Sequence, residues 1–199
     1  MSKISAMALQ QAKAALRKEL KLKLASMTVE ERAQQSNAIA QKLFLMLEYQ
    51  ASKRVCLYLH MAEEVHTTAI LKHALETDRD CFIPQYKGPV MKMVKLDSWE
   101  DFEKLPETKW KIKQPADDDV RPDALETGGL DLILMPGLGF TLTGDRIGRG
   151  KGYYDTYLQK CRDKGFHPKT IALAYKQQIC DSIPVTESDM KVDFVLSPD

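Results

Sequence analysis

The amino-acid sequence predicts an α/β fold, a three-layer α/β/α sandwich with a largely parallel sheet and an N-terminal helical pair. Short apolar runs that read as buried strands alternate along the chain with segments of helical periodicity. The first two helical segments follow one another directly at the N-terminus. At 199 residues the chain has the length of one domain. We therefore expect residues 1–199 to form a single α/β domain of Rossmann-like architecture, with helices on both faces of its sheet.

The N-terminal helical pair is predicted over about 6–26 and from Thr28 onward. A stripe of Leu and Ala at helical spacing indicates the first helix. Thr28 and Glu31 have the spacing of a capping box, which opens the second helix. Residues 1–24 are basic, as mitochondrial transit peptides also are, but the stripe continues into the body of the chain. We therefore expect a structural helix and a cytoplasmic protein.

The predicted strands and their connections place three loops at one edge of the sheet. The segment 131–135 is apolar on both alternating faces, which predicts a central strand, whereas the polar segment 97–129 predicts an irregular loop. In open parallel sheets, ligands bind beyond the carboxyl ends of the strands. We therefore expect 59–64, 136–140 and 175–176 to share one rim. The expected strands are 54–59, 81–84, 91–96, 131–135, 170–174 and 192–196, with later helices at 67–76 and 153–164.

Composition excludes several classes of protein. The formal net charge is only +1, so no global field favours a nucleic-acid or membrane partner. The four cysteines include no C-x-x-C pair, which argues against a zinc site or a disulfide framework. We expect a soluble monomer in a reducing compartment.

The segment from Arg146 to Asp155 carries the strongest functional signal. Glycines at 148, 150 and 152 let backbone amides turn toward an anion, and three cationic side chains lie among them. The helix predicted to begin nearby adds its N-terminal dipole. Because Gly152 follows Lys151 where a Walker A loop has Ser or Thr, this is a different phosphate-binding loop. We therefore predict an enzyme that uses a nucleoside triphosphate.

Three segments together resemble the 5-formyltetrahydrofolate cyclo-ligase family: 147–155, 136–140 and 13–17. The resemblance implies that ATP and Mg²⁺ drive the conversion of 5-formyltetrahydrofolate to 5,10-methenyltetrahydrofolate, with release of ADP and phosphate. It also implies a phosphorylated formyl intermediate, in which the formyl oxygen has attacked the γ-phosphate before N10 of the folate closes the ring. Catalysis would then consist mainly of positioning and charge neutralisation.

The resemblance also implies a role for individual residues. Catalytic roles fall on Arg149, Lys151 and Tyr153. ATP contacts fall on Lys13, Arg17, Arg146, Gly148, Arg149, Gly150, Lys151, Gly152, Tyr153 and Tyr154. Folate contacts fall on Leu59, Glu64 and the loop residues 149–153, and Mg²⁺ ligation on Asp155 and Asp189. Tyr86 and Trp110 are further aromatic candidates for stacking on a substrate ring.

Two positions depart from the family pattern, and two other functions stay open. Thr141 stands where an Asp is common, so it has no predicted metal role, and Gln85 stands where a basic residue is frequent. One alternative is a sugar-phosphate or other phosphoryl-transfer enzyme on a similar sheet, which would not need Leu59, Glu64 or the aromatic residues. The other is a nucleic-acid-binding module that uses the basic first helix, a function that would show steep salt dependence.

Overall fold

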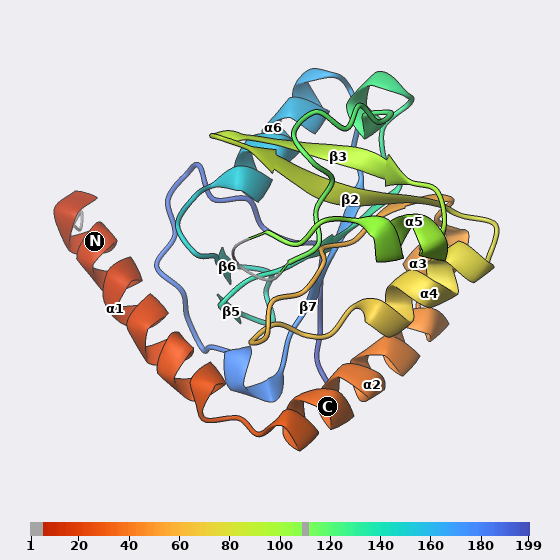
Figure 1. Ribbon diagram of the computed structural model, residues 1–199. Helices are drawn as coiled ribbons and strands as arrows, with labels where there is room; N and C mark the ends of the chain where they lie inside the picture. The colour runs from red at the N-terminus through yellow and green to blue at the C-terminus, as the bar shows by residue number, and fades with distance from the viewer. Residues whose placement is uncertain (1–5, 109–111) are drawn as a thin grey trace.

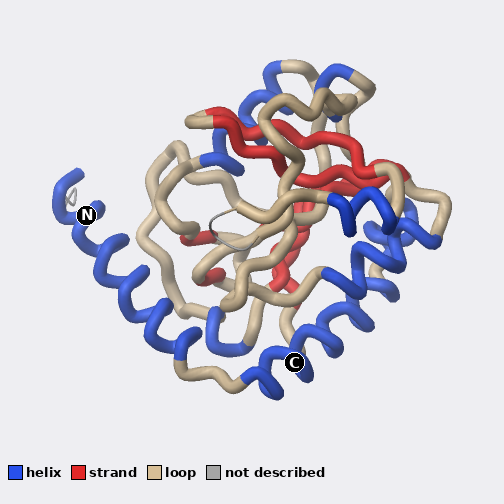
Figure 2. The backbone as a smooth tube through the Cα atoms, viewed as in Figure 1, coloured by secondary structure: helices blue, strands red, loops and turns tan. Residues whose placement is uncertain are grey.

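The structure is a computed structural model that describes residues 6–108 and 112–199. Its central sheet has the order β3-β2-β1-β4-β7-β8, and helices cover both faces (Figures 1 and 2). Only the β2–β3 pair is antiparallel, and the other neighbouring strands run parallel. The predicted α/β class with a largely parallel sheet is therefore confirmed. The strands of this sheet are β1 (Arg54–Cys56), β2 (Asp80–Lys87), β3 (Val90–Leu96), β4 (Leu132–Met135), β7 (Lys169–Leu173) and β8 (Phe194–Leu196).

The helices divide between the two faces of the sheet. One layer buries side chains from α1 (Ala6–Ala25), α2 (Val29–Leu45), α3 (Leu47–Ala51) and α4 (Thr68–Glu76), with α5 (Trp99–Lys104) packed against it. The other layer is built on α6 (Tyr153–Asp163) and the 3-10 turn η1 (Ala124–Glu126). A second 3-10 turn, η2 (Lys176–Gln178), follows β7. Two separate packed layers on one sheet confirm the three-layer sandwich.

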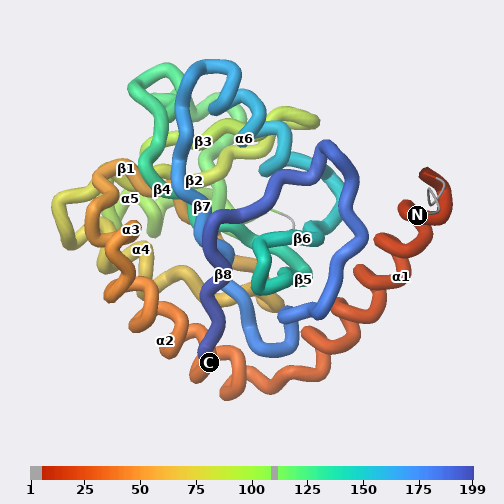
Figure 3. Tube along the Cα trace, turned by 180° about the vertical axis from the view of Figure 1, so that it is seen from behind, coloured from red at the N-terminus to blue at the C-terminus, as the bar shows by residue number. Residues whose placement is uncertain are grey.

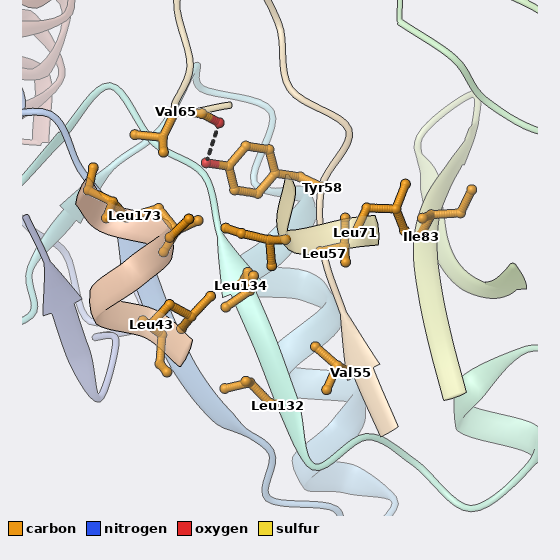
Figure 4. Packing of buried hydrophobic residues seen from close by; sticks show 14 of the residues in the cluster. Leu43, Val55, Leu57, Tyr58, Val65, Leu71, Ile83, Leu132, Leu134 and Leu173 are labelled. Atoms are coloured by element: carbon orange, nitrogen blue, oxygen red, sulfur yellow. Dashed lines mark hydrogen bonds between the residues drawn. The ribbon is translucent and has the colours of Figure 1, made fainter. Parts of the chain in front are cut away.

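Alternation along the strands produces these two layers. In β4 the side chains of Leu132 and Leu134 face the α2 and α4 layer, while Ile133 and Met135 face the α6 layer. All four are fully buried, because β1 and β7 flank β4 in the sheet. Figure 4 shows Leu132 and Leu134 packed with Leu43 of α2 and other apolar side chains of that layer. The prediction of a central, buried strand is therefore confirmed.

The N-terminal helical pair is also confirmed, and its first member reaches the loops at the sheet edge. The Thr28 side chain accepts from Glu31 N and the Glu31 carboxylate accepts from Thr28 N, so the capping box is complete. Figures 1 and 3 show α1 along the side of the molecule, beside β5, β6 and the loop that follows β7. None of the helices in residues 6–108 and 112–199 is long and apolar enough to cross a membrane.

The structure departs from the predicted elements most clearly in three places. The first strand ends at Cys56, because the backbone leaves the ladder while Leu57 and Tyr58 stay buried. Within the polar segment 97–129 the short helix α5 forms, with the Ser98 side chain accepting from Asp101 N at its start. A small hairpin, β5 (Gly139–Phe140) and β6 (Arg146–Ile147), was not predicted, since two-residue strands have no periodicity to detect.

Candidate active site

The loops that follow β1, β4 and β7 meet at the carboxyl edge of the sheet. The hydroxyl of Tyr175, after β7, donates a 2.8 Å hydrogen bond to the backbone carbonyl of Glu64, after β1. Nε2 of Gln178 donates to the carbonyl of Gly137, after β4, at 2.7 Å. The predicted shared rim is thus confirmed, because buried polar contacts tie the three loops together.

The glycine loop runs from Gly148 to Gly152 between β6 and α6. Gly150 and Gly152 have backbone φ values of +97° and +68°, which residues other than glycine rarely adopt. Gly152 is the N-cap residue of α6, so the backbone of the glycine loop lies at the positive end of the α6 helix dipole. An α-helix N-terminus preceded by open glycine backbone is a site suited to phosphate.

Two predicted cations of α1 lie against this loop. Nε of Arg17 donates to the carbonyl of Gly148 at 2.9 Å, and its guanidinium lies within 3.5 Å of where a side chain on Gly150 would begin. One turn earlier, the Lys13 ammonium pairs with the carboxylate of Asp189. The structure therefore places Arg17 against the glycine loop and pairs Lys13, one turn earlier, with Asp189, while their shared contact with a phosphate stays a prediction.

Arg149 joins the glycine loop to the acidic turn after β1. Its Nη2 lies 3.2 Å from Oε2 of Glu63, and its Nε lies 3.6 Å from Oε1 of Glu64. Glu64 N donates to the carbonyl of Met61, and the resulting turn directs both carboxylates to one guanidinium. By contrast, Lys151 is exposed and forms no ion pair with any described residue.

Glu64 is the more enclosed of the two carboxylates. Its side chain is 13% exposed, against 45% for Glu63. Burial raises the pKa of Glu64, and the hydrogen bond from Met61 N (3.0 Å) and the charge of Arg149 offset this only in part. A desolvated carboxylate at a strand end is well placed to accept from hydrogen-bond donors of a bound ligand.

The predicted aromatic residues divide into three groups. Tyr86 and Tyr153 form a tilted pair with ring centroids 5.0 Å apart, and the Tyr153 hydroxyl donates to the carbonyl of Gly88 in the β2–β3 turn. Tyr154 had been assigned to ATP, but its ring is buried in the α6 layer, because the first turn of α6 directs it into the core. Trp110 lies outside the described residues.

The predicted folate contact Leu59 is half-buried. It packs against the layer formed by α1 to α4, on the other face of the sheet from α6.

The two predicted metal ligands are each engaged by a cationic side chain. Asp155 accepts from Arg146 Nη2 at 2.8 Å and from Met190 N at 3.0 Å. Asp189 accepts from Lys13 and from Thr186 N. Burial acts to raise the pKa of Asp189, but these hydrogen bonds outweigh it and leave that pKa lowered. Within residues 6–108 and 112–199, no group of three or more His, Cys, Asp and Glu side chains is arranged to hold a metal.

Arg146 lies beneath the loop, not on its outer surface. Only 7% of its side chain is exposed, and the guanidinium is held by Asp155 and the carbonyl of Pro136. Its contact with ATP, like the metal ligation by Asp155 and Asp189, stays a prediction.

Sequence reasoning overlooked two hydroxyl groups behind the site. Ser36 of α2 and Tyr175 are both buried, and both connect to the turn that carries Glu64. A signal for Ser36 existed: it continues the apolar stripe of Ile39, Ala40 and Leu43, where a polar side chain needs a buried partner.

The fold and the site define an α/β protein with a glycine-rich loop, suited to an anion, at the carboxyl edge of its sheet. A profile of the 5-formyltetrahydrofolate cyclo-ligase family matches residues 9–198. The chain belongs to this family and is an enzyme of the ligase class.

Relatives and solved structures agree with this assignment. The chain is 49% identical to the 5-formyltetrahydrofolate cyclo-ligase of Mus musculus, over 98% of each chain. It is 38% identical to a probable 5-formyltetrahydrofolate cyclo-ligase of Caenorhabditis elegans, over 95% of this chain and 94% of that protein. The 5,10-methenyltetrahydrofolate synthetase of Aquifex aeolicus is structurally similar, with a TM-score of 0.77, 27% identity and coverage of 94% and 89%. The synthetase of Mycoplasma pneumoniae, at 20% identity and a TM-score of 0.71, supports the fold alone.

Proposed function

We propose that this enzyme converts 5-formyltetrahydrofolate to 5,10-methenyltetrahydrofolate at the expense of ATP, and that residues 1–199 act as one catalytic domain. The names of the relatives support the substrate and product. The observation that carries the proposal is Arg149, which connects the phosphate-type loop to the buried carboxylate of Glu64. A site for a polyphosphate and a site for a second, hydrogen-bonding substrate therefore adjoin one another.

The reaction requires activation of a poor leaving group. Transfer of the γ-phosphoryl group from ATP to the formyl oxygen releases ADP and makes that oxygen part of a phosphate ester. N10 then attacks the same carbon and loses its proton, and the carbon–oxygen bond breaks to release inorganic phosphate and leave the closed ring. In the proposed roles, the glycine-loop amides and Lys151 stabilise the transferring phosphoryl charge, and Lys13 and Arg17 hold the nucleotide phosphates. Arg149 and Glu64 orient the folate, with Leu59 and the Tyr86–Tyr153 pair covering its rings.

A Mg²⁺ ion that binds together with the nucleotide would use carboxylates at this edge of the sheet. Mg²⁺ commonly takes one or two carboxylates, phosphate oxygens and waters, and it neutralises phosphate charge when bound. The contacts of Asp189 with Lys13 and Thr186 all go through Oδ2, so within the described part of the chain Oδ1 accepts no hydrogen bond. We propose Asp189 and Asp155 as the protein ligands.

Loss of Arg17 should weaken ATP binding. Arg17→Ala removes a guanidinium that lies on the glycine loop, so the KM for ATP should rise about tenfold, the equivalent of about 1.4 kcal/mol, with a smaller change in kcat. Steady-state kinetics at saturating 5-formyltetrahydrofolate measure this. Lys18→Ala, which removes the adjacent exposed charge of α1, is the matched control and should leave the KM unchanged. An equal rise in both variants would contradict a specific contact.

Loss of either proposed metal ligand should raise the metal requirement. Asp189→Asn and Asp155→Asn each remove one carboxylate charge, so more Mg²⁺ should be needed for half-maximal activity, and a chelator should abolish activity of the unmodified enzyme. Glu187→Gln removes the same charge two residues from Asp189 on an exposed side chain, and its Mg²⁺ titration should match that of the unmodified enzyme. Unchanged titrations for both Asn variants would remove these residues from the metal site.

Stoichiometry tests the proposed reaction against the sugar-phosphate alternative. ADP and phosphate should appear together, one of each per folate consumed, and neither should appear when 5-formyltetrahydrofolate is omitted. Hydrolysis of ATP that is independent of folate but stimulated by a sugar phosphate would favour the alternative. We further propose a cytoplasmic monomer without a nucleic-acid partner, which size-exclusion chromatography, salt-dependent binding assays and cell fractionation test.

A further inference from the structure

Four buried or half-buried side chains hold the backbone of residues 64–67, the segment that carries Glu64. They come from α2, from the chain just after β1 and from the chain just after β7. The hydrogen bonds are Tyr175 Oη to Glu64 O (2.8 Å), Tyr58 Oη to Val65 O (3.2 Å), His66 N to Ser36 Oγ (3.0 Å) and Thr67 N to His60 Nδ1 (3.1 Å). Side chains, not a strand partner, therefore fix this segment.

Two of these contacts belong to one ordered chain of hydroxyl groups. Ser36 Oγ lies 3.2 Å from Tyr175 Oη. Because the Tyr175 proton is donated to Glu64 O, Tyr175 must accept the proton of Ser36. Ser36 Oγ in turn accepts from His66 N. Each hydroxyl therefore donates once and accepts once, an arrangement in which neighbouring hydrogen bonds strengthen one another.

Burial makes this chain costly to break. Tyr175 is 0% exposed and Ser36 is 3% exposed, so water cannot readily replace a lost partner. The chain connects the carbonyl of Glu64 to the amide of His66, two residues apart on one turn. A shift of the Glu64 backbone would leave buried hydroxyl or amide groups unpaired, so the turn has one favoured position.

We propose that Tyr175 is a positioning residue that sets Glu64 for the reduced folate, an inference that rests on the proposed function. Its hydroxyl contacts only the backbone of Glu64 and the side chain of Ser36 among the described contacts, so it acts through Glu64. The Glu64 carboxylate is thereby directed toward Arg149 and the glycine loop. Supporting hydrogen bonds of this kind are what keep a binding group in its productive geometry.

Tyr175→Phe removes the hydroxyl and keeps the ring. Binding of 5-formyltetrahydrofolate, measured by titration calorimetry, should weaken about three- to tenfold, which corresponds to the loss of one hydrogen bond. ATP affinity without folate should not change. Tyr49→Phe is the matched control, because Tyr49 is also fully buried and its hydroxyl bonds to His73 Nδ1 at 2.9 Å, away from the rim. It should lower thermal stability but leave folate binding intact.

A double variant tests whether Tyr175 acts through Glu64. In a Glu64→Gln background, Tyr175→Phe should cause little further loss of folate binding, because the carboxylate it positions is already gone. Ser36→Ala should reproduce the effect of Tyr175→Phe from the other end of the chain. Normal folate binding by Tyr175→Phe, or fully additive losses in the double variant, would overturn the inference alone. Absence of folate binding by the unmodified enzyme would overturn the proposed function as well.

Discussion

Lys151→Ala should lower kcat about a hundred- to a thousandfold while the protein stays folded. Lys151 lies in the glycine loop one residue before the N-cap of α6, and it is exposed and without an ion-pair partner in the described part of the chain. Its charge is therefore available to a transferring phosphoryl group, where removal of one well-placed donor typically costs about 2.7–4 kcal/mol. Because this charge acts mainly in the transition state, kcat should fall more than the affinity for either substrate.

The control for this variant removes an equivalent charge nearby. Lys160→Ala takes away an exposed ammonium from α6, the helix that follows the loop, and should leave kcat unchanged. Thermal unfolding of both variants checks that the fold is intact, and steady-state kinetics measure kcat and both KM values. Full activity in Lys151→Ala would show that the glycine loop does not serve phosphoryl transfer.

Glu64→Gln should weaken 5-formyltetrahydrofolate binding about ten- to a hundredfold. The variant keeps the shape of the side chain but removes its charge, and hydrogen bonds to a charged group contribute about 1.5–3 kcal/mol, at about 1.4 kcal/mol per decade of affinity. The carboxylate is largely enclosed, and in the proposed role this would strengthen its hydrogen bonds with the donors of a 2-aminopyrimidinone ring. ATP affinity measured without folate should barely change.

The neighbouring carboxylate and the pH dependence provide the comparisons. Glu63→Gln removes the other partner of Arg149 from a more exposed position, so its effect on folate binding should be much smaller. Burial raises the pKa of Glu64, and in its proposed role the ionised carboxylate is the form that binds the folate. As the pH is lowered, folate affinity should therefore begin to fall at a higher pH than it would with a solvent-exposed Glu at this position. This pH dependence should disappear in Glu64→Gln. Paired titrations that find normal folate binding in Glu64→Gln would refute the assignment.

Local sequence patterns predicted most of the fold. The segment 131–135 is apolar on both faces, a pattern expected of a strand that is covered on both sides of the sheet. The strand β4 is covered in this way by the two helical layers. Thr28 and Glu31 predicted the start of α2 to the residue, because a capping box is a contact between near neighbours. By contrast α5 and the β5–β6 hairpin were missed, since they are too short to establish a period.

The candidate site was predictable as a set of residues but not as a set of contacts. The composition of the glycine loop predicts phosphate binding, which stays a prediction, and the strand-end rule placed Glu64 on the same rim. The pairing of Lys13 with Asp189 joins residues separated by 176 positions, and no periodicity or spacing encodes such a contact. The contact of Arg149 with both Glu63 and Glu64 depends on the turn closed by Glu64 N and the carbonyl of Met61, and sequence spacing does not encode that geometry.

Formation of the product tests the central claim most directly. The purified protein, ATP, Mg²⁺ and 5-formyltetrahydrofolate are mixed, and the near-ultraviolet absorbance of 5,10-methenyltetrahydrofolate is followed with time. We predict that this absorbance rises only in the complete mixture, and that omission of ATP or of the protein prevents it. A complete mixture in which the folate is bound but no methenyl absorbance develops would contradict the proposed reaction.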